Sequence, residues 1–240
     1  MWIIASLIGA YLLGSIPFSL IIGKRVKGID LREHGSGNLG STNVYRILGP
    51  GWGGLCLFLD IAKGALAVIL VTVVVATYPE GQDLPLHLNK NIYRIIAAVV
   101  GILGHSFSPF ASFKGGKGIA TTFGAFLVLQ PYGILIAFGA FLSVFFATRI
   151  VSLGSLSAAA IFPWATVFFE VRSPKPFSLT LIIFSFALSG IIIWRHRANI
   201  KRLREGTEQP INRPKDELEE AKAAADLTIR EIAGDDPEQQ

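Results

Sequence analysis

A glycine-rich polar segment near the N-terminus has the composition of an anion-binding loop. It reads Gly35-Ser-Gly-Asn-Leu-Gly-Ser-Thr-Asn-Val-Tyr-Arg46 and follows the basic stretch 24–32. Glycines let backbone N–H groups approach a phosphate closely, while hydroxyl and amide side chains donate hydrogen bonds. The segment therefore predicts a phosphate cradle, with a flexible polar loop as the alternative. The candidate ligands are Gly35, Ser36, Gly37, Asn38, Gly40, Thr42, Asn43 and Arg46.

The glycine spacing of this segment also matches G-x-G-x-x-G, the fingerprint of dinucleotide-binding domains. That fingerprint needs a preceding strand inside a βαβ unit. The flanking sequence is instead typical of membrane helices, so we exclude a dinucleotide site.

A second cationic segment, Lys-Gly-Gly-Lys-Gly at 114–118, lies between two apolar runs. Two cations beside a tightly turning backbone that then opens a helix would form another anion site. The segment is not a Walker A loop, because Gly-x4-Gly-Lys-Ser/Thr is absent. Anchoring of the lysines at the cytoplasmic face is the alternative, and it explains the charges but not the glycines. The candidate ligands are His105, Lys114, Gly115, Gly116, Lys117 and Gly118.

Two shorter polar segments also follow apolar runs. Ser152 lies in 149–155, and His196 and Asn199 lie in the basic segment 195–204. On a helix that leaves the membrane, His196 and Asn199 are three residues apart and share a face. All three are candidates for the site, with an interfacial histidine and a helix-packing serine as the structural alternatives.

The composition indicates that these polar segments belong to a membrane protein. Of the 240 residues, 51% are hydrophobic and 16% are charged, whereas soluble domains average about 25% charged residues. A core of the size that this chain can form does not hide that apolar excess, so we expect a bilayer to cover the rest. The single cysteine, Cys56, excludes an intrachain disulfide framework and a cysteine-based metal cluster.

Charge divides the chain into two parts. Residues 1–205 hold 18 Lys and Arg against 7 Asp and Glu, a net charge of +11, whereas 206–240 hold 4 against 10, a net charge of −6. We expect a membrane domain over 1–205 and an acidic cytoplasmic tail over 206–240. Within the tail, 206–214 is typical of a linker, and weak helical spacing of apolar residues predicts a helix over 215–233. A disordered tail is the alternative.

Charge-free runs mark the membrane spans, at 1–23, 64–79, 95–113, 118–148, 150–169 and 176–194. A span needs about 20 apolar residues, so the second run must borrow part of 51–62. That extension brings Asp60 and Lys63 into or near the membrane, where a structural ion pair between them is expected. The first run has no basic start and no clear cleavage site, so we expect a retained helix rather than a signal peptide.

The run 118–148 decides the topology. Gln130-Pro131 interrupts it near the middle, and proline ends or kinks a helix. If the run crosses once, the basic stretch 24–32 and the basic segment 195–204 lie on opposite sides, against the positive-inside rule. If the run forms two short helices, the two basic segments lie on the same side, which is then the cytoplasmic one. We therefore predict an all-α polytopic membrane protein with seven transmembrane helices, some short or partial, the N-terminus outside and the C-terminus cytoplasmic.

Together these segments resemble the bacterial membrane glycerol-3-phosphate acyltransferases that use acyl-phosphate as donor. The likeness includes Gly14-Ser-Ile-Pro17 and Leu59-Asp-Ile-Ala-Lys-Gly64 and covers residues 5 to about 208 in order. Ser-Gly-Asn-x-Gly-x-Thr-Asn-x-x-Arg and Phe-Lys-Gly-Gly-Lys-Gly-x-Ala-Thr are specific to that family when they occur together. The chain departs from the family pattern at Ser108, where a proline is frequent, and in its extension 209–240.

The resemblance implies an acyltransferase of phospholipid biosynthesis in the bacterial inner membrane, with its active site facing the cytoplasm. It would move a fatty acyl group from acyl-phosphate to the 1-hydroxyl of glycerol 3-phosphate, which gives lysophosphatidic acid and phosphate. A partner enzyme makes the acyl-phosphate, and neither coenzyme A nor acyl carrier protein is used directly. We expect no cofactor, no metal and no nucleic-acid partner.

The resemblance also implies residue roles. The catalytic set is Ser36, Asn38, Arg46, Lys114, His196 and Asn199. The substrate-binding set is Gly35, Gly37, Gly40, Thr42, Asn43, His105, Gly115, Gly116, Lys117, Gly118 and Ser152. Because phosphate is a good leaving group, direct transfer without a covalent acyl-enzyme suffices. The proton acceptor is open between His105, His196 and the donor phosphate.

Two other functions account for part of the sequence. A transporter of organic phosphates or anions also uses broken helices and cationic liners, but the polar segments are predicted to gather on one face and no internal repeat is evident. A structural subunit that holds anionic lipid accounts for the basic loops but not for the glycine and asparagine spacing.

Overall fold

The computed structural model describes residues 1–79, 84–174 and 177–211, and all regular structure within them is helical. The predicted all-α fold is confirmed, while the predicted helix over 215–233 lies outside the described residues. The described helices are α1 (Trp2–Ser15), α2 (Phe18–Lys27), α3 (Ser41–Leu48), α4 (Pro50–Ala76), η1 (Pro85–His87), α5 (Lys90–Ser106), η2 (Pro109–Ala111), α6 (Ile119–Leu129), α7 (Pro131–Thr148), α8 (Val151–Arg172), α9 (Leu179–Arg195) and α10 (Arg197–Arg204).

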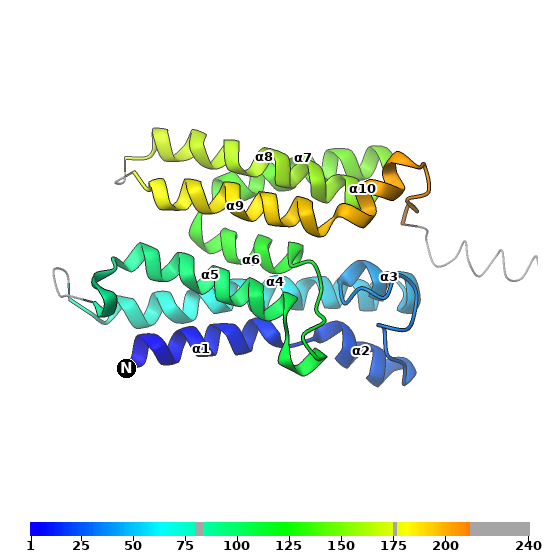
Figure 1. Cartoon of the computed structure of the whole chain (residues 1–240), viewed down its shortest axis with the longest axis horizontal. Helices are drawn as coiled ribbons and strands as arrows, with labels where there is room; N and C mark the ends of the chain where they lie inside the picture. The colour runs from blue at the N-terminus through cyan, green and yellow to red at the C-terminus, as the bar shows by residue number, and fades with distance from the viewer. Residues whose placement is uncertain (80–83, 175–176, 212–240) are drawn as a thin grey trace, which may run out of the picture.

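The helices form two groups with α6 between them (Figure 1). In one group α1, α4 and α5 pack against one another, and α6 packs on α4 and α5. In the other, α8 packs against both α7 and α9. The short helices α2, α3 and α10 lie at the end of the molecule opposite the N-terminus, and the long connection between α5 and α6 runs toward α2 and α3 (Figure 1). The segments that the sequence marks as candidate sites therefore gather toward one end.

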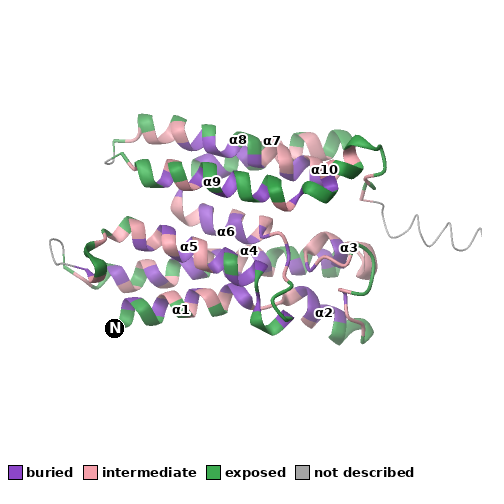
Figure 2. Cartoon of the chain, in the orientation of Figure 1, coloured by how far each residue is buried: buried purple, intermediate pink, exposed green. Residues whose placement is uncertain are grey.

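Exposed residues lie along the outer faces of the long helices, while buried residues face neighbouring helices (Figure 2). Many of the exposed residues are large and apolar. Phe58, Val73, Trp164 and Ile183 are 60–66% exposed. A soluble protein rarely exposes apolar area on this scale. Among the described residues, five segments are long and apolar enough to cross a membrane, and α9 with α10, bent by 57°, forms a sixth if the pair counts as one span. The surface is therefore suited to a bilayer.

The predicted break at Gln130-Pro131 is present, because α6 ends at Leu129 and α7 begins at Pro131. The Gln130 side chain is buried and hydrogen-bonds Thr166 of α8 through both of its amide atoms at 3.3 Å, which ties the break to the second helix group. α6 has 11 residues, a rise of about 16 Å against a hydrocarbon thickness of about 30 Å. The total of seven spans and the orientation of the termini stay predictions.

Small residues let α4 and α6 approach each other backbone to backbone. A Cβ added at Gly64 would lie 2.1 Å from the carbonyl oxygen of Thr121, and one added at Gly124 would lie 1.9 Å from that of Ile61. Such contacts are typical of helix interfaces in membranes, where packing replaces hydrophobic burial as the driving force. Since α6 begins directly after Gly118, this interface also fixes the end of the second glycine-rich segment.

Replacing Gly124 by alanine should push α4 and α6 apart and lower stability. The added methyl group would meet rigid helix backbone, and overpacking of this kind costs about 1–3 kcal/mol. We expect the thermal unfolding midpoint of the detergent-solubilised protein to fall by about 3–10 °C. Gly139→Ala in α7 is the matched control, because nothing lies within 4 Å of its added Cβ. Equal midpoints in the two variants would contradict the packing argument.

Candidate active site

The candidate residues reach one end of the molecule from four segments. Residues 28–40 connect α2 to α3 and carry the first glycines, and residues 112–118 precede α6 and carry both lysines. Ser152 lies in the first turn of α8. His196 separates α9 from α10, and Asn199 lies in the first turn of α10.

Asn43, in the first turn of α3, holds the first glycine loop together. Its Oδ1 accepts hydrogen bonds from the backbone N–H of Ser36 at 2.9 Å and from the Ser36 hydroxyl at 3.2 Å. Its Nδ2 donates to the carbonyl oxygens of Leu31 and His34, both at 3.1 Å. Gly35 has φ +60°, and a Cβ there would lie 2.4 Å from Oδ1 of Asn43. The buried amide of Asn43 is thus fully engaged in shaping the loop.

The second glycine loop packs against His105. A Cβ at Gly116 would lie 2.4 Å from Nε2 of His105 and 2.7 Å from the carbonyl oxygen of Leu39, so only glycine fits. Gly118 has φ +84°, a left-handed conformation that favours glycine. Nη2 of Arg195 donates to the carbonyl oxygen of Gly116 at 2.8 Å. Membrane anchoring would explain the lysines of this loop but not its glycines. Close packing of the loop backbone explains why glycine occupies these positions.

The two lysines of this loop have different surroundings. Lys114 is exposed, and among the described residues its ammonium has no hydrogen-bond or ion-pair partner. Lys117 is partly buried, and its Nζ donates a short hydrogen bond to Oδ1 of Asn199. Only the second lysine is therefore joined to the polar side chains of α10.

Three side chains hold one carboxylate at this end of the molecule. Oε1 of Glu208 accepts hydrogen bonds from Oγ of Ser152 and from Nδ2 of Asn199, both at 2.6 Å. Oε2 forms an ion pair with Nε of Arg202, also at 2.6 Å. Lys117 supports them through the Asn199 amide. We call Lys117, Ser152, Asn199 and Arg202 the anion cluster.

The anion cluster has a strongly positive local potential. Burial is the main cause that lowers the pKa of the Lys117 ammonium to about 8. Nearby guanidinium groups act in the same direction, and they belong to Arg202, Arg195 and Arg46. Burial by itself would raise the pKa of Glu208, but hydrogen bonds from its three donors outweigh burial, and that pKa lies below its usual range. An anion is therefore stabilised in this cluster.

The tautomer of His196 is set by the backbone. Its Nδ1 lies 2.8 Å from the carbonyl oxygen of Ile192, so in the neutral ring Nδ1 carries the hydrogen and Nε2 is an acceptor. The ring is buried and lies three residues before Asn199. Of the two candidate histidines, His196 is the one next to the anion cluster in the chain.

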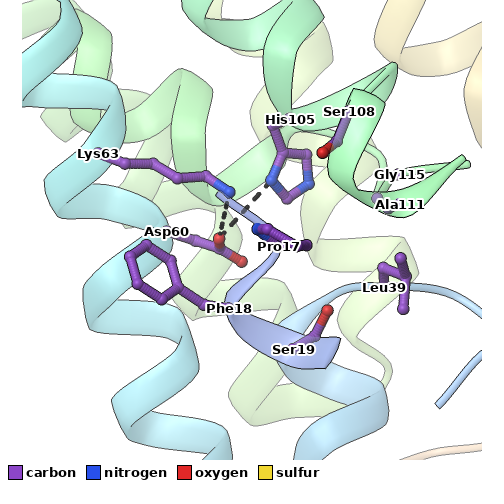
Figure 3. A pocket seen from close by; sticks show the side chains of 11 residues that line it. Pro17, Phe18, Ser19, Leu39, Asp60, Lys63, His105, Ser108, Ala111 and Gly115 are labelled. Atoms are coloured by element: carbon purple, nitrogen blue, oxygen red, sulfur yellow. Dashed lines mark ion pairs between the residues drawn. The ribbon is translucent and has the colours of Figure 1, made fainter. Parts of the chain in front are cut away.

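His105 instead faces a buried ion pair beneath the glycine loops (Figure 3). Nζ of Lys63 is 2.7 Å from Oδ1 of Asp60, and both side chains are only 3% exposed. Nζ also donates to the carbonyl oxygen of Ile16 at 2.8 Å, next to Pro17, where the chain breaks between α1 and α2. Nδ1 of His105 lies 3.6 Å from the same oxygen of Asp60. The predicted pair between Asp60 and Lys63 is confirmed.

A short segment after α10, residues 205–211, crosses the anion cluster, and we call it the strap. Besides inserting Glu208, it accepts a hydrogen bond from Nη2 of Arg46 at the carbonyl oxygen of Gln209, at 3.0 Å. The backbone N–H of Ile211 donates to the carbonyl oxygen of Arg149 at 2.8 Å. The strap therefore joins α3, α8 and α10.

The structure extends the sequence-based set by three residues, Arg195, Arg202 and Glu208. Arg202 lies three residues after Asn199, a spacing that shares a helix face and could have identified it. Glu208 has no local signal, because its partner Ser152 lies 56 residues away. Conversely, among the described residues no hydrogen bond joins the first glycine loop, with Ser36, Asn38 and Thr42, to the anion cluster.

An apolar pocket with a volume of about 100 Å³ lies between α5 and α9. Val99 and Phe184 line it far from the loops, and Lys117 and Arg195 line it at the polar end. Nε of Arg195 is buried and has no hydrogen-bond partner among the described residues. The pocket thus combines an apolar interior with two cations at one end.

The family model and the two relatives below have the same name. The family model "Glycerol-3-phosphate acyltransferase" matches residues 4–206. Glycerol-3-phosphate acyltransferase 2 of Bacillus anthracis is 43% identical over 209 residues, which cover 87% of this chain and 98% of the relative. Glycerol-3-phosphate acyltransferase of Chlorobium phaeobacteroides is 39% identical over 221 residues, which cover 84% and 93%.

Solved structures agree with the sequence relatives. The crystal structure of PlsY (YgiH), an integral membrane glycerol 3-phosphate acyltransferase, in its glycerol 3-phosphate form has a TM-score of 0.72 and 36% identity. The match covers 88% of this chain and 96% of that chain. The lysophosphatidic acid form of PlsY has a TM-score of 0.69 at the same identity and covers 87% and 94%.

Anion binding by the cluster should weaken as the pH rises through about 8, because the folded-state pKa of Lys117 is lowered to that value. The positive charge is present below this pH and lost above it. Sulfate is the probe, because its charge does not change in this pH range. Calorimetric titrations of the purified protein, one to two pH units below and above the pKa, should show the affinity for sulfate falling by about 10-fold. Lys117→Arg should flatten the profile, since arginine stays protonated. The same fall in both proteins would exclude Lys117 as its cause.

Proposed function

Because this chain belongs to the glycerol-3-phosphate acyltransferase family of integral membrane enzymes in phospholipid synthesis, we propose that it uses acyl-phosphate as the donor. The fatty acyl group moves to the 1-hydroxyl of glycerol 3-phosphate and gives lysophosphatidic acid and inorganic phosphate. The observation that carries the proposal is an anion cluster next to the polar end of an apolar pocket, with Lys117 common to both. Family membership favours this enzyme over an organic-phosphate transporter.

The anion cluster is proposed to bind the phosphate of glycerol 3-phosphate. Ser152 and Asn199 already donate hydrogen bonds to a carboxylate, and Lys117 and Arg202 add charge. Arg46 lies close enough to affect Lys117 electrostatically, so it is a further ligand. The remaining proposed contributors are Ser36, Asn38, Thr42 and Lys114, with Gly35, Gly37, Gly40 and Asn43 shaping the first loop.

The phosphate of the donor is proposed to bind at the second glycine loop. Gly115, Gly116 and Gly118 let the loop pack closely and turn into α6, and the first turn of α6 offers backbone N–H groups that the helix ladder does not use. The unpaired Nε of Arg195 supports an anion at this position, since a buried guanidinium N–H without a partner is costly. The acyl chain would then extend from Arg195 into the apolar pocket toward Val99 and Phe184.

The reaction is proposed to be a direct transfer. The 1-hydroxyl oxygen attacks the carbonyl carbon of the mixed anhydride, and the carbonyl carbon to phosphate oxygen bond breaks and releases phosphate. Cations and backbone N–H groups stabilise the charge that develops on the carbonyl oxygen and on the leaving phosphate. No covalent acyl-enzyme is needed, because phosphate already leaves easily. Cys56, the single thiol, is fully buried in α4 against Asp60.

Two groups can accept the proton of the attacking hydroxyl. Nε2 of His196 is an acceptor because the Ile192 carbonyl holds the hydrogen on Nδ1. A phosphate oxygen of the donor is the other acceptor, and it lies next to the attacked carbon by its own covalent structure. His105 is a supporting residue in this proposal, since its ring is packed between Asp60 and Gly116.

The setting of the reaction is part of the proposal. The chain would cross the bacterial inner membrane seven times with the N-terminus outside, so that both glycine loops face the cytoplasm. Glycerol 3-phosphate would arrive from that side, and acyl-phosphate would come from a partner enzyme that makes it. The gathering of α2, α3, α10 and the loops at one end supports a single-faced site (Figure 1).

The activity can be tested with the purified full chain in detergent, acyl-phosphate and labelled glycerol 3-phosphate. We expect lysophosphatidic acid to form, and we expect Lys117→Ala, Arg46→Ala and Lys114→Ala each to lower kcat/KM for glycerol 3-phosphate by about 10²-fold. Lys201→Ala is the control, because that side chain is 77% exposed. Absence of product from a folded sample, or equal rates in all the variants, would contradict the proposal.

Chain-length preference should depend on Val99. Val99→Phe fills the far end of the apolar pocket, so long acyl-phosphates should lose about 10-fold or more in kcat/KM relative to short ones. The control is Val73→Phe in α4, where the side chain is 60% exposed on the outer face. Competition between two acyl-phosphates of different length gives the ratio directly. An unchanged ratio in Val99→Phe would exclude this pocket as the acyl site.

A further inference from the structure

The carboxylate of Glu208 is buried although the strap that carries it is largely exposed. The Glu208 side chain is 7% exposed. Its neighbours Thr207 and Gln209 are exposed. All three of its hydrogen bonds go to members of the anion cluster. A single acidic side chain therefore fills the cluster from a segment that has little other burial.

The charges around Glu208 suit a phosphate at least as well as a carboxylate. Lys117, Arg46, Arg195 and Arg202 form an excess of positive charge over the single carboxylate. A phosphate monoester presents more charge and more acceptor oxygens to the same donors. Exchange of one anion for the other leaves no buried donor without a partner.

The strap engages a second candidate ligand at the same time. Arg46 donates to the carbonyl oxygen of Gln209, the residue after Glu208. Withdrawal of the strap would free this guanidinium together with the hydroxyl of Ser152 and the amide of Asn199. Withdrawal would also break the backbone hydrogen bond from Ile211 to Arg149, which attaches the end of the closed strap.

We propose that Glu208 is an internal anion that occupies the phosphate site of the substrate-free protein and that the phosphate of the acceptor substrate displaces it. This proposal rests on the proposed function of the anion cluster. Occupation by Glu208 keeps the cluster assembled and partly offsets its positive charge between turnovers. It also lowers the apparent affinity for phosphate, which equals the intrinsic affinity multiplied by the fraction of molecules whose strap is open.

Glu208→Gln tests the competition, because glutamine keeps the shape and a hydrogen-bond acceptor but removes the charge. The probe is inorganic phosphate, titrated calorimetrically into the purified full chain. If the strap is closed in about nine of ten molecules, the affinity should rise by about 10-fold. Glu205→Gln is the matched control on the same strap, since Glu205 is exposed and, within the part of the chain that the structure describes, pairs only with Lys201, at 3.8 Å. Unchanged or weaker phosphate binding by a folded Glu208→Gln protein would overturn the proposal.

A reversible disulfide cross-link, which we call the lock, tests the same proposal if the Glu208→Gln protein does not fold. Arg149→Cys combined with Ile211→Cys joins the two residues whose backbones are hydrogen-bonded, and the native Cys56 is fully buried. Oxidation should hold the strap closed and lower phosphate affinity by about 10-fold or more, and reduction should restore it. Equal affinity in the oxidised and reduced protein would overturn the proposal.

Acyl transfer by the same preparations separates this inference from the reaction on which it rests. If lysophosphatidic acid forms but neither Glu208→Gln nor the lock changes phosphate affinity, the internal-anion proposal alone is wrong. If phosphate affinity responds to both changes but no acyl transfer occurs, the internal anion is supported and the proposed reaction is wrong.

Discussion

The ion pair between Asp60 and Lys63 is the interaction on which the site depends. An unpaired charge at the centre of a membrane helix costs roughly 3 kcal/mol on insertion scales, so neither residue is tolerable in α4 without the other. Lys63 also needs the carbonyl oxygen of Ile16, which requires the break between α1 and α2. His105 packs on the same carboxylate and turns its other ring nitrogen to Gly116. The position of the second glycine loop thus follows from how two buried charges are satisfied.

A second electrostatic constraint acts at the anion cluster. Several guanidinium groups and a partly buried ammonium repel one another, and burial together with this repulsion lowers the pKa of Lys117. A cluster of this kind is stable only with an anion inside it. The carboxylate of Glu208 meets that need in the substrate-free protein, so a phosphate-binding site can be assembled before phosphate arrives. Pre-assembly lowers the cost of reorganisation when substrate binds.

The sequence predicts those features that depend on local chemistry. The break at Gln130 and the pairing of Asp60 with Lys63 follow from short-range rules, and the structure has both. Burial depends on tertiary packing, so the sequence treats Lys114 and Lys117 alike, whereas the structure exposes one and partly buries the other. Glu208 was not predicted for the same reason, because its partners come from separate helices. Composition alone assigns its segment to a polar linker.

Lys117 and Arg195 lie where the apolar pocket meets the polar loops, which gives the two substrates of the proposed reaction separate routes to one place. Both line the polar end of the apolar pocket, and Lys117 also belongs to the anion cluster. Under the proposed function, a polar acceptor would enter from the loops and the acyl chain would lie between α5 and α9, so that neither crosses the other's path. In the proposed reaction their reacting ends would meet at the polar end of the pocket, which Lys117 and Arg195 line. The proposed product would retain both a phosphate and an acyl chain, so it would fit the boundary at which it forms and would leave sideways into lipid.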